Sequence, residues 1–486
     1  MLGLRAAAVG LALLACPAPA FGQAEYRVYR EHPRLFLEDT RLARLRKDVD
    51  RQTLRWQALA GLVEAGAVFP EQPLVDALRF QAAGSGDSGR DAVKWAARLA
   101  ADGIRSAADL RLAAIVYDWC HPLFDPESRN AVRAAIAEAV EAVLPMAGSD
   151  VGLVRAAIMA SIAVAGEWKD SERALAGLLG THWAADVRPQ LASGQLADDG
   201  ASLVAVLEAS LAVRHNLETD LLRPATEALA SLVRTRLLSY YPLDIDTPEG
   251  LCRRPSRFGA DDRQAAMQAP LYRIAELLLV AYESNLREFQ FIQGWIRDEQ
   301  YLLRSPLVAP YEFLWVNPYL PGLSPQSAPT LAHDGVRGRL YGRTRWERPA
   351  AWIGYADGRL DLLTQDGSSV SGSLDGLSPM YFPDAVVVPV KPPARFSLQW
   401  QPAGRPAPEV VKIYLIGLRP AETYGLKVGG RPARLVEAGP GGILVLHSDP
   451  AAPRKDRIDL RRKVRFDLRP TLKPTDPRRP PPTLRR

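Results

Sequence analysis

The chain has 486 residues, of which 47% are hydrophobic and 24% are charged. This balance excludes a fully disordered chain, and the length exceeds what one compact core usually supports, so we expect two domains. The formal net charge of +6 comes from residues 451–486, with 13 Lys and Arg against 4 Asp; the rest is slightly acidic, and we expect no nucleic-acid partner.

The first 22 residues have the pattern of a secretory signal peptide. Arg5 precedes the short apolar run AAAVGLALLAC, and the small residues Ala20 and Gly22 suit cleavage after Gly22. The stretch LLAC offers an alternative, a bacterial lipobox in which Cys16 would carry a lipid anchor. No later stretch is apolar over the roughly 18 residues that a transmembrane helix needs. The sequence therefore predicts a periplasmic or secreted protein without a transmembrane segment.

Between residues 38 and 304 the apolar residues recur with helical spacing. This pattern predicts about ten to twelve helices that pack against one another on several sides. Ser106 is a predicted N-cap, and a second helix begins with Asp125 as N-cap and Pro126 at its first position. We assign residues 23–305 to an all-α domain.

Two cysteines follow the signal peptide, Cys120 and Cys252, and two are too few for a disulfide framework. Cys120 lies in an apolar helix and is expected to behave as a small hydrophobic residue. The six histidines show no spacing typical of a zinc site. The sequence therefore predicts neither a cofactor nor a metal site.

The segment PYEFLWVNPYLPGL, residues 310–323, separates the helical pattern from a strand pattern. Its prolines predict neither a regular helix nor a central strand. Tyr311 and Trp315 have two interpretations: they pack between the domains, or they form a platform for a sugar ring in a cleft. His333 and Asp334 follow as a titratable pair suited to acid and base chemistry.

Downstream, short β-branched or alternating runs are separated by Gly, Pro and Asp. WIGYADGRLDLL predicts a hairpin with an Asp-Gly turn, and TYGLKVGGRPARLVEAGPGGILVLHSD predicts two linked hairpins. Together they predict an antiparallel β-sandwich over residues 306–465, including the seam 306–335. Residues 466–486 are basic and Pro-rich, which predicts a disordered tail, either solvated or in weak contact with acidic lipid, envelope polymer or nucleic acid.

Three stretches resemble one family. HPRLFLEDTRLARLRKDV, AAIVYDWCHPLFDPESRNAVRAAI and the seam with the strands after it are similar to heparinase II/III-like and alginate-lyase-like proteins. The resemblance implies an incomplete (α/α) toroid followed by an antiparallel β-sandwich, with acidic, uronic-acid polysaccharide bound between them. It also implies β-elimination, which needs a group to neutralise the C5 carboxylate, a base for the C5 proton and an acid for the leaving oxygen.

The residues for that chemistry depart from the family's pattern. Ser149 and Asp150 stand where the resemblance implies an asparagine pair, and apolar residues follow Asp199 where it implies a tyrosine. His333 is the histidine nearest to the first strands. The catalytic candidates are therefore Asp150, Asp199 and His333. The two aspartates are also the only pair that we would consider for inverting hydrolysis, and Asp150 has the alternative of a helix cap.

The substrate-binding candidates are Arg254 and Arg257, in the predicted interhelical loop LCRRPSRFGADDR, together with Tyr311 and Trp315. Arginine suits paired hydrogen bonds to a uronate or sulfate, although a solvated loop is the alternative. Arg155 is either a cleft residue or a surface arginine. Two classes of function stay open: a polysaccharide lyase, and a catalytically silent carbohydrate-binding or envelope-assembly protein on the same scaffold.

Overall fold

The structure of the protein is a computed structural model. It describes residues 26–28, 31–146, 148, 150–194, 200–247, 250–255, 262–298, 305–347, 350–356, 358–365, 368–372, 374, 376–400, 410–448 and 458–471. The predicted cleavage after Gly22 and the predicted lipid anchor at Cys16 both fall outside these residues.

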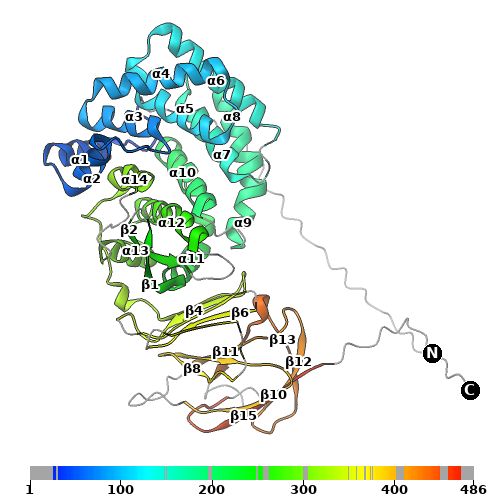
Figure 1. The fold of residues 1–486 in the computed structure, drawn as a ribbon. Helices are drawn as coiled ribbons and strands as arrows, with labels where there is room; N and C mark the ends of the chain where they lie inside the picture. Colours follow the sequence, from blue (N-terminus) through cyan, green and yellow to red (C-terminus); the bar gives the residue numbers. More distant parts are fainter. Residues whose placement is uncertain are drawn as a thin grey trace, which may run out of the picture.

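The N-terminal part is helical, as predicted, and strands follow it (Figure 1). The α-helices are α1 (Asp39–Asp50), α2 (Leu54–Glu64), α3 (Gln72–Ala83), α4 (Gly86–Asp102), α5 (Ala107–Trp119), α6 (Pro126–Val143), α7 (Val151–Ala163), α8 (Ser171–Gly177), α9 (Arg188–Ala192), α10 (Gly200–Leu217), α11 (Thr226–Ser239), α12 (Asp262–Tyr282), α13 (Arg287–Asp298) and α14 (Val308–Trp315). A π-helical stretch, η2 (Leu178–Val187), joins α8 to α9, and α5 is followed by a 3-10 turn, η1 (His121–Leu123).

Two predicted helix starts are confirmed. The Ser106 side chain accepts a hydrogen bond from the backbone N–H of Asp109 at the start of α5. At the start of α6, Asp125 accepts from the N–H groups of the second and third helical residues, and Pro126 occupies the first position. These local bonds satisfy donors that a helix terminus leaves open.

The helices pack in a continuous order. Helix α3 contacts α5, α5 contacts α7, α7 contacts α10, α10 contacts α12, α12 contacts α14, and α14 returns to α2 and α3. Helices α4 and α6 lie against α5, and α13 lies against α11 and α12. Because α5, α7 and α10 have neighbours on several sides, they are buried around most of their circumference. Cys120, at the end of α5, is fully buried, as its apolar surroundings predicted.

None of the helices among the described residues has the length and apolar character that crossing a membrane would need. A small antiparallel hairpin, β1 (Tyr240–Thr247) and β2 (Gly250–Pro255), interrupts the helices. The sequence had predicted a loop for the stretch that begins at residue 251, so β2 is a difference from that prediction. The two strands satisfy each other's backbone groups, which explains how an extended segment is tolerated among helices.

Among the described residues, the strands after α14 form three sheets. The first has the order β3-β4-β5-β6-β7, the second β14-β11-β9-β8, and the third β10-β15-β12-β13. Their bounds are β3 (Leu331–Asp334), β4 (Arg339–Arg343), β5 (Trp352–Ala356), β6 (Arg359–Leu363), β7 (Ser369–Ser371), β8 (Met380–Tyr381), β9 (Ala385–Pro389), β10 (Ala394–Leu398), β11 (Val411–Ile416), β12 (Thr423–Val428), β13 (Arg434–Glu437), β14 (Leu444–Ser448) and β15 (Val464–Pro470).

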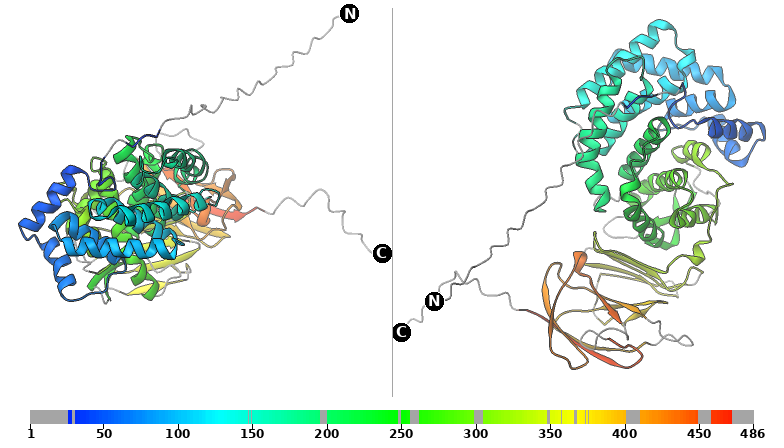
Figure 2. Two further views of the ribbon diagram at one scale, coloured as in Figure 1. Left: turned by 90° about the horizontal axis from the view of Figure 1, so that it is seen from above. Right: turned by 180° about the vertical axis from the view of Figure 1, so that it is seen from behind.

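The second sheet lies between the other two. Val386 and Val388 of β9 pack toward the third sheet, whereas Val387 packs toward the first. The continuous apolar run AVVVPV is explained by this burial on both faces. The first sheet also contacts the helices, since the indole N–H of Trp352 donates to the backbone oxygen of Leu238 in α11 at 2.8 Å. The view from behind in Figure 2 shows the helices and the sheets at opposite ends of the molecule.

Several strand predictions are confirmed and others are corrected. The predicted hairpins β5–β6 and β12–β13 are both present as antiparallel pairs. The second linked hairpin is wrong, because β14 pairs with β11 in another sheet. The pair β9–β11 is parallel, so the sheets are not all antiparallel. Strand β15 continues to Pro470, and the buried Phe466 and Leu468 belong to it rather than to the predicted tail.

The proline-rich seam contains a regular helix, contrary to the prediction. Helix α14 begins at Val308, so Pro310 is its third residue. The N–H groups of the first helical turn have no partner within the helix, and a proline there loses no hydrogen bond. The entire helix is buried against α2, α3 and α12.

Candidate functional site

The predicted catalytic residues do not gather in the described part of the molecule. Asp150 is exposed and caps α7, accepting from the N–H groups of Gly152 and Leu153 at 2.9 and 3.1 Å. Asp199 lies outside the described residues. The cap explains the position of Asp150 without a ligand, and a catalytic role for either aspartate stays a prediction.

His333 lies in β3, inside the sheet region. Its ring packs edge-on against Tyr414, with ring centroids 5.4 Å apart, and burial lowers the pKa of His333. Asp334 accepts from the backbone N–H groups of Val336 and Arg337, both at 3.0 Å, and from the Arg337 guanidinium at 2.8 Å. His333 and Asp334 are thus the last residues of β3, and Asp334 stabilises the turn that follows. A role for the pair in acid and base chemistry stays a prediction.

The predicted substrate-binding residues are dispersed. Arg254 lies in β2, and Arg257 lies outside the described residues. Tyr311 and Trp315 lie on α14 and are each only 3% exposed. The two aromatic residues lie in different polar environments. Tyr311 lies in the centre of the helices, and Trp315 lies near their surface.

Tyr311 belongs to a buried ionic cluster in the centre of the helices. Its hydroxyl accepts from Arg111 of α5 at 2.6 Å and donates to Glu71, before α3, at 2.7 Å. Arg111 also donates to both carboxylate oxygens of Glu208 in α10, at 2.8 and 2.5 Å. Arg155 of α7 donates to Glu208 at 3.0 Å. The central cluster therefore ties five separate elements together.

The charges of the central cluster stabilise one another. Burial alone would raise the pKa of Glu208, but Arg111 and Arg155 hold it below its usual value. Burial alone would likewise lower the pKa of Arg111, and the carboxylates of Glu208 and Glu71 raise it instead. Burial raises the pKa of Tyr311. Because these groups are paired inside the protein, the cluster mainly fixes the helices relative to one another.

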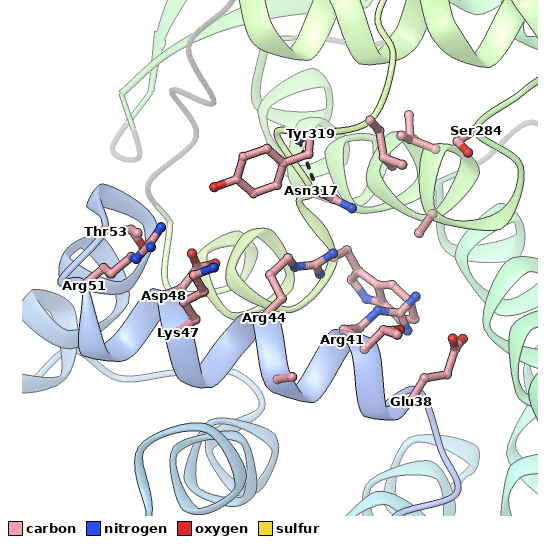
Figure 3. Close-up of a pocket in the computed structure, with 16 residues that line it drawn as sticks. Glu38, Arg41, Arg44, Lys47, Asp48, Arg51, Thr53, Ser284, Asn317 and Tyr319 are labelled. Carbon is pink, nitrogen blue, oxygen red and sulfur yellow. Dashed lines mark hydrogen bonds between the residues drawn. The ribbon is translucent and has the colours of Figure 1, made fainter.

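An open groove of about 550 Å³ lies between α1 and the segment that follows α14. One wall is the face of α1 that carries four cations, and the opposite wall contains Asn317 and Tyr319 (Figure 3). We call this cavity the α1 groove; its charged and polar lining residues are Glu38, Thr40, Arg41, Arg44, Lys47, Asp48, Arg51, Thr53, Ser284, Asn317 and Tyr319. Trp315 also lines it.

Two of the four cations are anchored. The Arg41 guanidinium lies 4.4 Å from the centroid of the Trp315 ring, and burial lowers the pKa of Arg41 to about 10, so it remains charged at neutral pH. Arg44 donates to the backbone oxygen of Leu314 at 3.3 Å. Because this oxygen lies near the C-terminus of α14, the contact also places a cation at the negative end of a helix dipole.

The other two cations, Lys47 and Arg51, are exposed. Within the described residues, no ion pair joins either of them to a carboxylate, whereas Asp48 between them is paired with Arg55 at 2.7 Å. Opposite them, the Tyr319 side chain is 79% exposed, and the Asn317 side-chain oxygen accepts from the Tyr319 N–H at 3.1 Å. The groove therefore combines solvated positive charge with an exposed aromatic ring and an oriented amide.

A second cavity of about 570 Å³ adjoins the groove, and Glu38 and Arg41 line both. In the second cavity His215 of α10 contacts Glu38 at 2.5 Å. The two cavities are therefore neighbours at the start of α1.

The α1 groove was not predicted from the sequence, although the sequence contains a signal for it. The cations of α1 occur at positions 41, 44, 47 and 51, and residues three or four apart lie on the same face of a helix. The spacing identifies a basic face. Only the fold shows that Tyr319, far along the chain, lies across from it.

No protein-family model matches the chain, and no curated protein matches it. Among solved structures, the chain is similar to a mutant chondroitin AC lyase of Streptomyces coelicolor A3, at 14% sequence identity and a TM-score of 0.39. That match covers 65% of this chain and 49% of the lyase, so the chain spans about half the lyase's length. A second similar structure is a glycoside hydrolase, at 9% identity and a TM-score of 0.29, with 82% of this chain and 72% of that chain covered.

Proposed function

We propose that this protein binds an acidic, uronic-acid polysaccharide in the α1 groove. The observation that carries the proposal is the row of cations on α1, in which Lys47 and Arg51 are exposed and face Tyr319 across an open channel. Arginine and lysine bind carboxylates or sulfates, and an exposed aromatic ring can stack on the apolar face of a sugar.

The spacing of the cations favours a polymer over a compact anion. Arg41 lies in the first turn of α1 and Arg51 directly follows its last residue, so about ten helical steps, or about 15 Å, separate them. Charges spread over this length match a linear chain with repeated acidic groups better than a single phosphate or carboxylate. The second cavity extends the same path past Arg41.

The proposal includes two further predictions. The family resemblance predicts an incomplete (α/α) toroid as the scaffold, and the signal-peptide pattern predicts that the protein is exported. The packing order α3, α5, α7, α10, α12 and α14, with α14 returning to α3, supports an incomplete (α/α) toroid. The signal-peptide pattern of residues 1–22 supports export. In this proposal an exported protein meets its polysaccharide outside the cytoplasm.

Replacing both Lys47 and Arg51 by alanine is expected to weaken binding of a uronic-acid polymer at least about ten-fold, because two solvated cations are lost. The affinity of the intact protein should also fall with rising salt. Isothermal titration against alginate, pectate and chondroitin sulfate measures both effects.

The matched control is the double variant Lys94→Ala and Arg90→Ala on α4, which removes the same two residue types from another exposed helix face. Its affinity should equal that of the wild type. Equal losses in both double variants, or no loss in the groove variant, would reject the α1 groove as the binding site.

A second candidate function is β-elimination in the same groove. The phenol of Tyr319, the amide of Asn317 and the guanidinium of Arg44 line one cavity (Figure 3). They could supply the base or acid and neutralise the substrate carboxylate, the roles that elimination requires. This candidate adds a reaction to the proposed binding.

If elimination occurs, incubation with the same polymers should produce unsaturated ends, seen as rising ultraviolet absorbance of the new double bond. Tyr319→Phe should reduce the rate at least about 100-fold, the typical effect of losing a general acid or base, while binding persists. Loss of the rate in Asp150→Asn and not in Tyr319→Phe would place the chemistry at the residues that the sequence predicted. Binding without new absorbance would identify a silent binding protein.

A further inference from the structure

Two histidines and a glutamate meet at the ends of α5 and α7, outside the α1 groove. His32 lies in the segment before α1, His121 begins the turn η1, and Glu167 follows α7. The Glu167 Oε1 atom lies 3.1 Å from His32 Nε2 and 3.2 Å from His121 Nε2. The three potential ligand atoms all lie within 4.8 Å of one another.

The surroundings hold two of these side chains in fixed orientations. His32 Nδ1 lies 2.6 Å from Asp118, whose carboxylate also accepts from the backbone N–H groups of Arg34 and Leu35 at 2.7 to 2.9 Å. His32 is therefore bound through Nδ1, and its Nε2 points to Glu167. The Tyr117 hydroxyl donates to Glu167 Oε2 at 2.7 Å and leaves Oε1 to face the histidines.

His121 Nε2 is the least satisfied atom of the group. It is buried and makes no hydrogen bond of acceptable geometry among the described residues, although Glu167 Oε1 is close. His32 Nε2 and Glu167 Oε1 are joined by a hydrogen bond of 3.1 Å, whereas His121 Nε2 converges on the same oxygen without a hydrogen bond of its own. A cation between them would supply the missing partner.

We propose that His32, His121 and Glu167 bind one Zn²⁺ ion. Two imidazole nitrogens and a carboxylate oxygen are common zinc ligands, and three protein ligands leave a fourth position for water. Bonds of about 2.0–2.1 Å in a tetrahedral site separate neighbouring ligand atoms by about 3.3 Å. The distances from Glu167 to the two histidines already have this size.

The Asp118 carboxylate supports the proposed site by binding the ligand residue His32 rather than the metal. A histidine that binds zinc usually donates its other ring N–H to a carboxylate or a carbonyl, which fixes the ring and raises the basicity of the ligand nitrogen. The contact from His32 Nδ1 to Asp118 has this arrangement. Tyr117 similarly orients the Glu167 carboxylate.

Metal capture requires one local movement. The His32 and His121 rings are stacked, with centroids 3.9 Å apart and an angle of 12° between their planes, so their Nε2 lone pairs do not yet point to one shared centre. His121 lies in a three-residue turn with its side chain 21% exposed, whereas His32 is held by Asp118. In this proposal the His121 ring, which is the less constrained of the two, has to turn out of the stack when the metal binds.

The proposed site has a structural consequence. His32 belongs to the extended segment that crosses the ends of α5 and α7, where the Arg34 guanidinium donates to backbone oxygens of Ala163 and Ala165 at 3.0 and 2.9 Å. A zinc ion would fasten this segment to both helices. Since the metal would bind the folded state, it would stabilise the protein.

The test uses the full chain after chelation and dialysis. Titration with Zn²⁺ against a chromophoric chelator should show one bound ion per chain, and the thermal midpoint should rise on adding Zn²⁺. Mg²⁺ at the same concentration should leave the midpoint unchanged, because magnesium prefers all-oxygen sites. His121→Ala and Glu167→Gln should each bind Zn²⁺ at least about ten-fold more weakly, the typical loss on altering a metal site.

His447→Ala is the matched control, since His447 is an exposed histidine of β14. It should bind Zn²⁺ as the wild type does. His121→Ala leaves the bond between His32 and Asp118 intact, and circular dichroism checks that it is folded. The proposal is overturned if the wild type binds no stoichiometric Zn²⁺, if both site variants bind as tightly as the wild type, or if Mg²⁺ raises the midpoint equally.

Discussion

Replacing Glu208 by alanine is expected to lower the free energy of unfolding by about 3–5 kcal/mol, the usual cost of removing one partner from a buried ion pair. Glu208 is only 1% exposed and accepts hydrogen bonds from Arg111 and Arg155. Without it, two buried guanidinium groups lose their shared carboxylate, and Glu71 alone remains to balance Arg111. Chemical denaturation of the wild type and the variant measures the difference.

Glu208 also makes the free energy of unfolding depend on pH. The pKa of Glu208 in the folded protein is below its usual value, so its ionised form is stabilised by folding. That stabilisation is fully present above the unfolded pKa of about 4.3 and disappears as the pH falls through the lower folded pKa. The difference between the wild type and Glu208→Ala should therefore narrow below about pH 4.

Glu227→Ala is the control, because Glu227 is 92% exposed and pairs with Arg234 across 3.4 Å. Exposed pairs contribute little to stability, and this variant should unfold like the wild type. Equal effects of the two substitutions, or a Glu208 variant as stable as the wild type, would show that the central cluster does not hold the helices together.

A methyl group added at Gly294 is expected to destabilise the protein by about 1–3 kcal/mol or more, as overpacking of a filled site does. Gly294 lies in α13, and a Cβ atom there would collide with the backbone oxygen of Leu323. The same helix binds the segment after α14, since the backbone oxygen of Gln290 accepts from the N–H of Leu323 at 2.9 Å, and the Gln293 side chain donates to the Asn317 backbone oxygen at 3.1 Å.

This segment carries Tyr319 and forms one wall of the α1 groove. Gly294→Ala should therefore also weaken binding of the uronic-acid polymer, although residue 294 does not line the groove. The effect would be read by the titration used for Lys47 and Arg51, after thermal unfolding has established a temperature at which the variant is folded.

Gly61→Ala is the matched control. Gly61 is also inside a helix, α2, but a Cβ atom there would meet nothing within 4 Å. Alanine should then stabilise the helix by about 0.5–1 kcal/mol, because glycine loses more backbone freedom on folding. Gly294→Ala is therefore expected to lower the stability of the protein and Gly61→Ala to raise it. If Gly294→Ala left the stability unchanged, α13 and the segment after α14 could move apart without an energetic cost.

The two proposed sites and the central cluster are physically separate. The α1 groove lies between α1 and the segment after α14, the zinc site lies at the ends of α5 and α7, and the central cluster lies among the inner helices. Zinc binding and polymer binding can therefore be tested independently, and the failure of one experiment leaves the other proposal standing.

The sequence by itself determined the features that depend on neighbouring residues. Ser106 and Asp125 cap helices through bonds that span two or three positions, and Ala356 at the end of β5 pairs with Arg359 at the start of β6 over a similar distance. It also determined the change from helices to strands, because hydrophobic spacing differs between the two. Pro310 was misinterpreted, since its effect depends on its place within the helix.

Only the tertiary structure decided which distant residues meet. His32 and Glu167 are 135 positions apart, and Arg111 and Tyr311 are 200 apart. No local spacing encodes such pairs, because each side chain sits on an element whose placement depends on the packing of the others. The pairing of β14 with β11 has the same cause: burial between two sheets, rather than the turn before it, selected the partner strand.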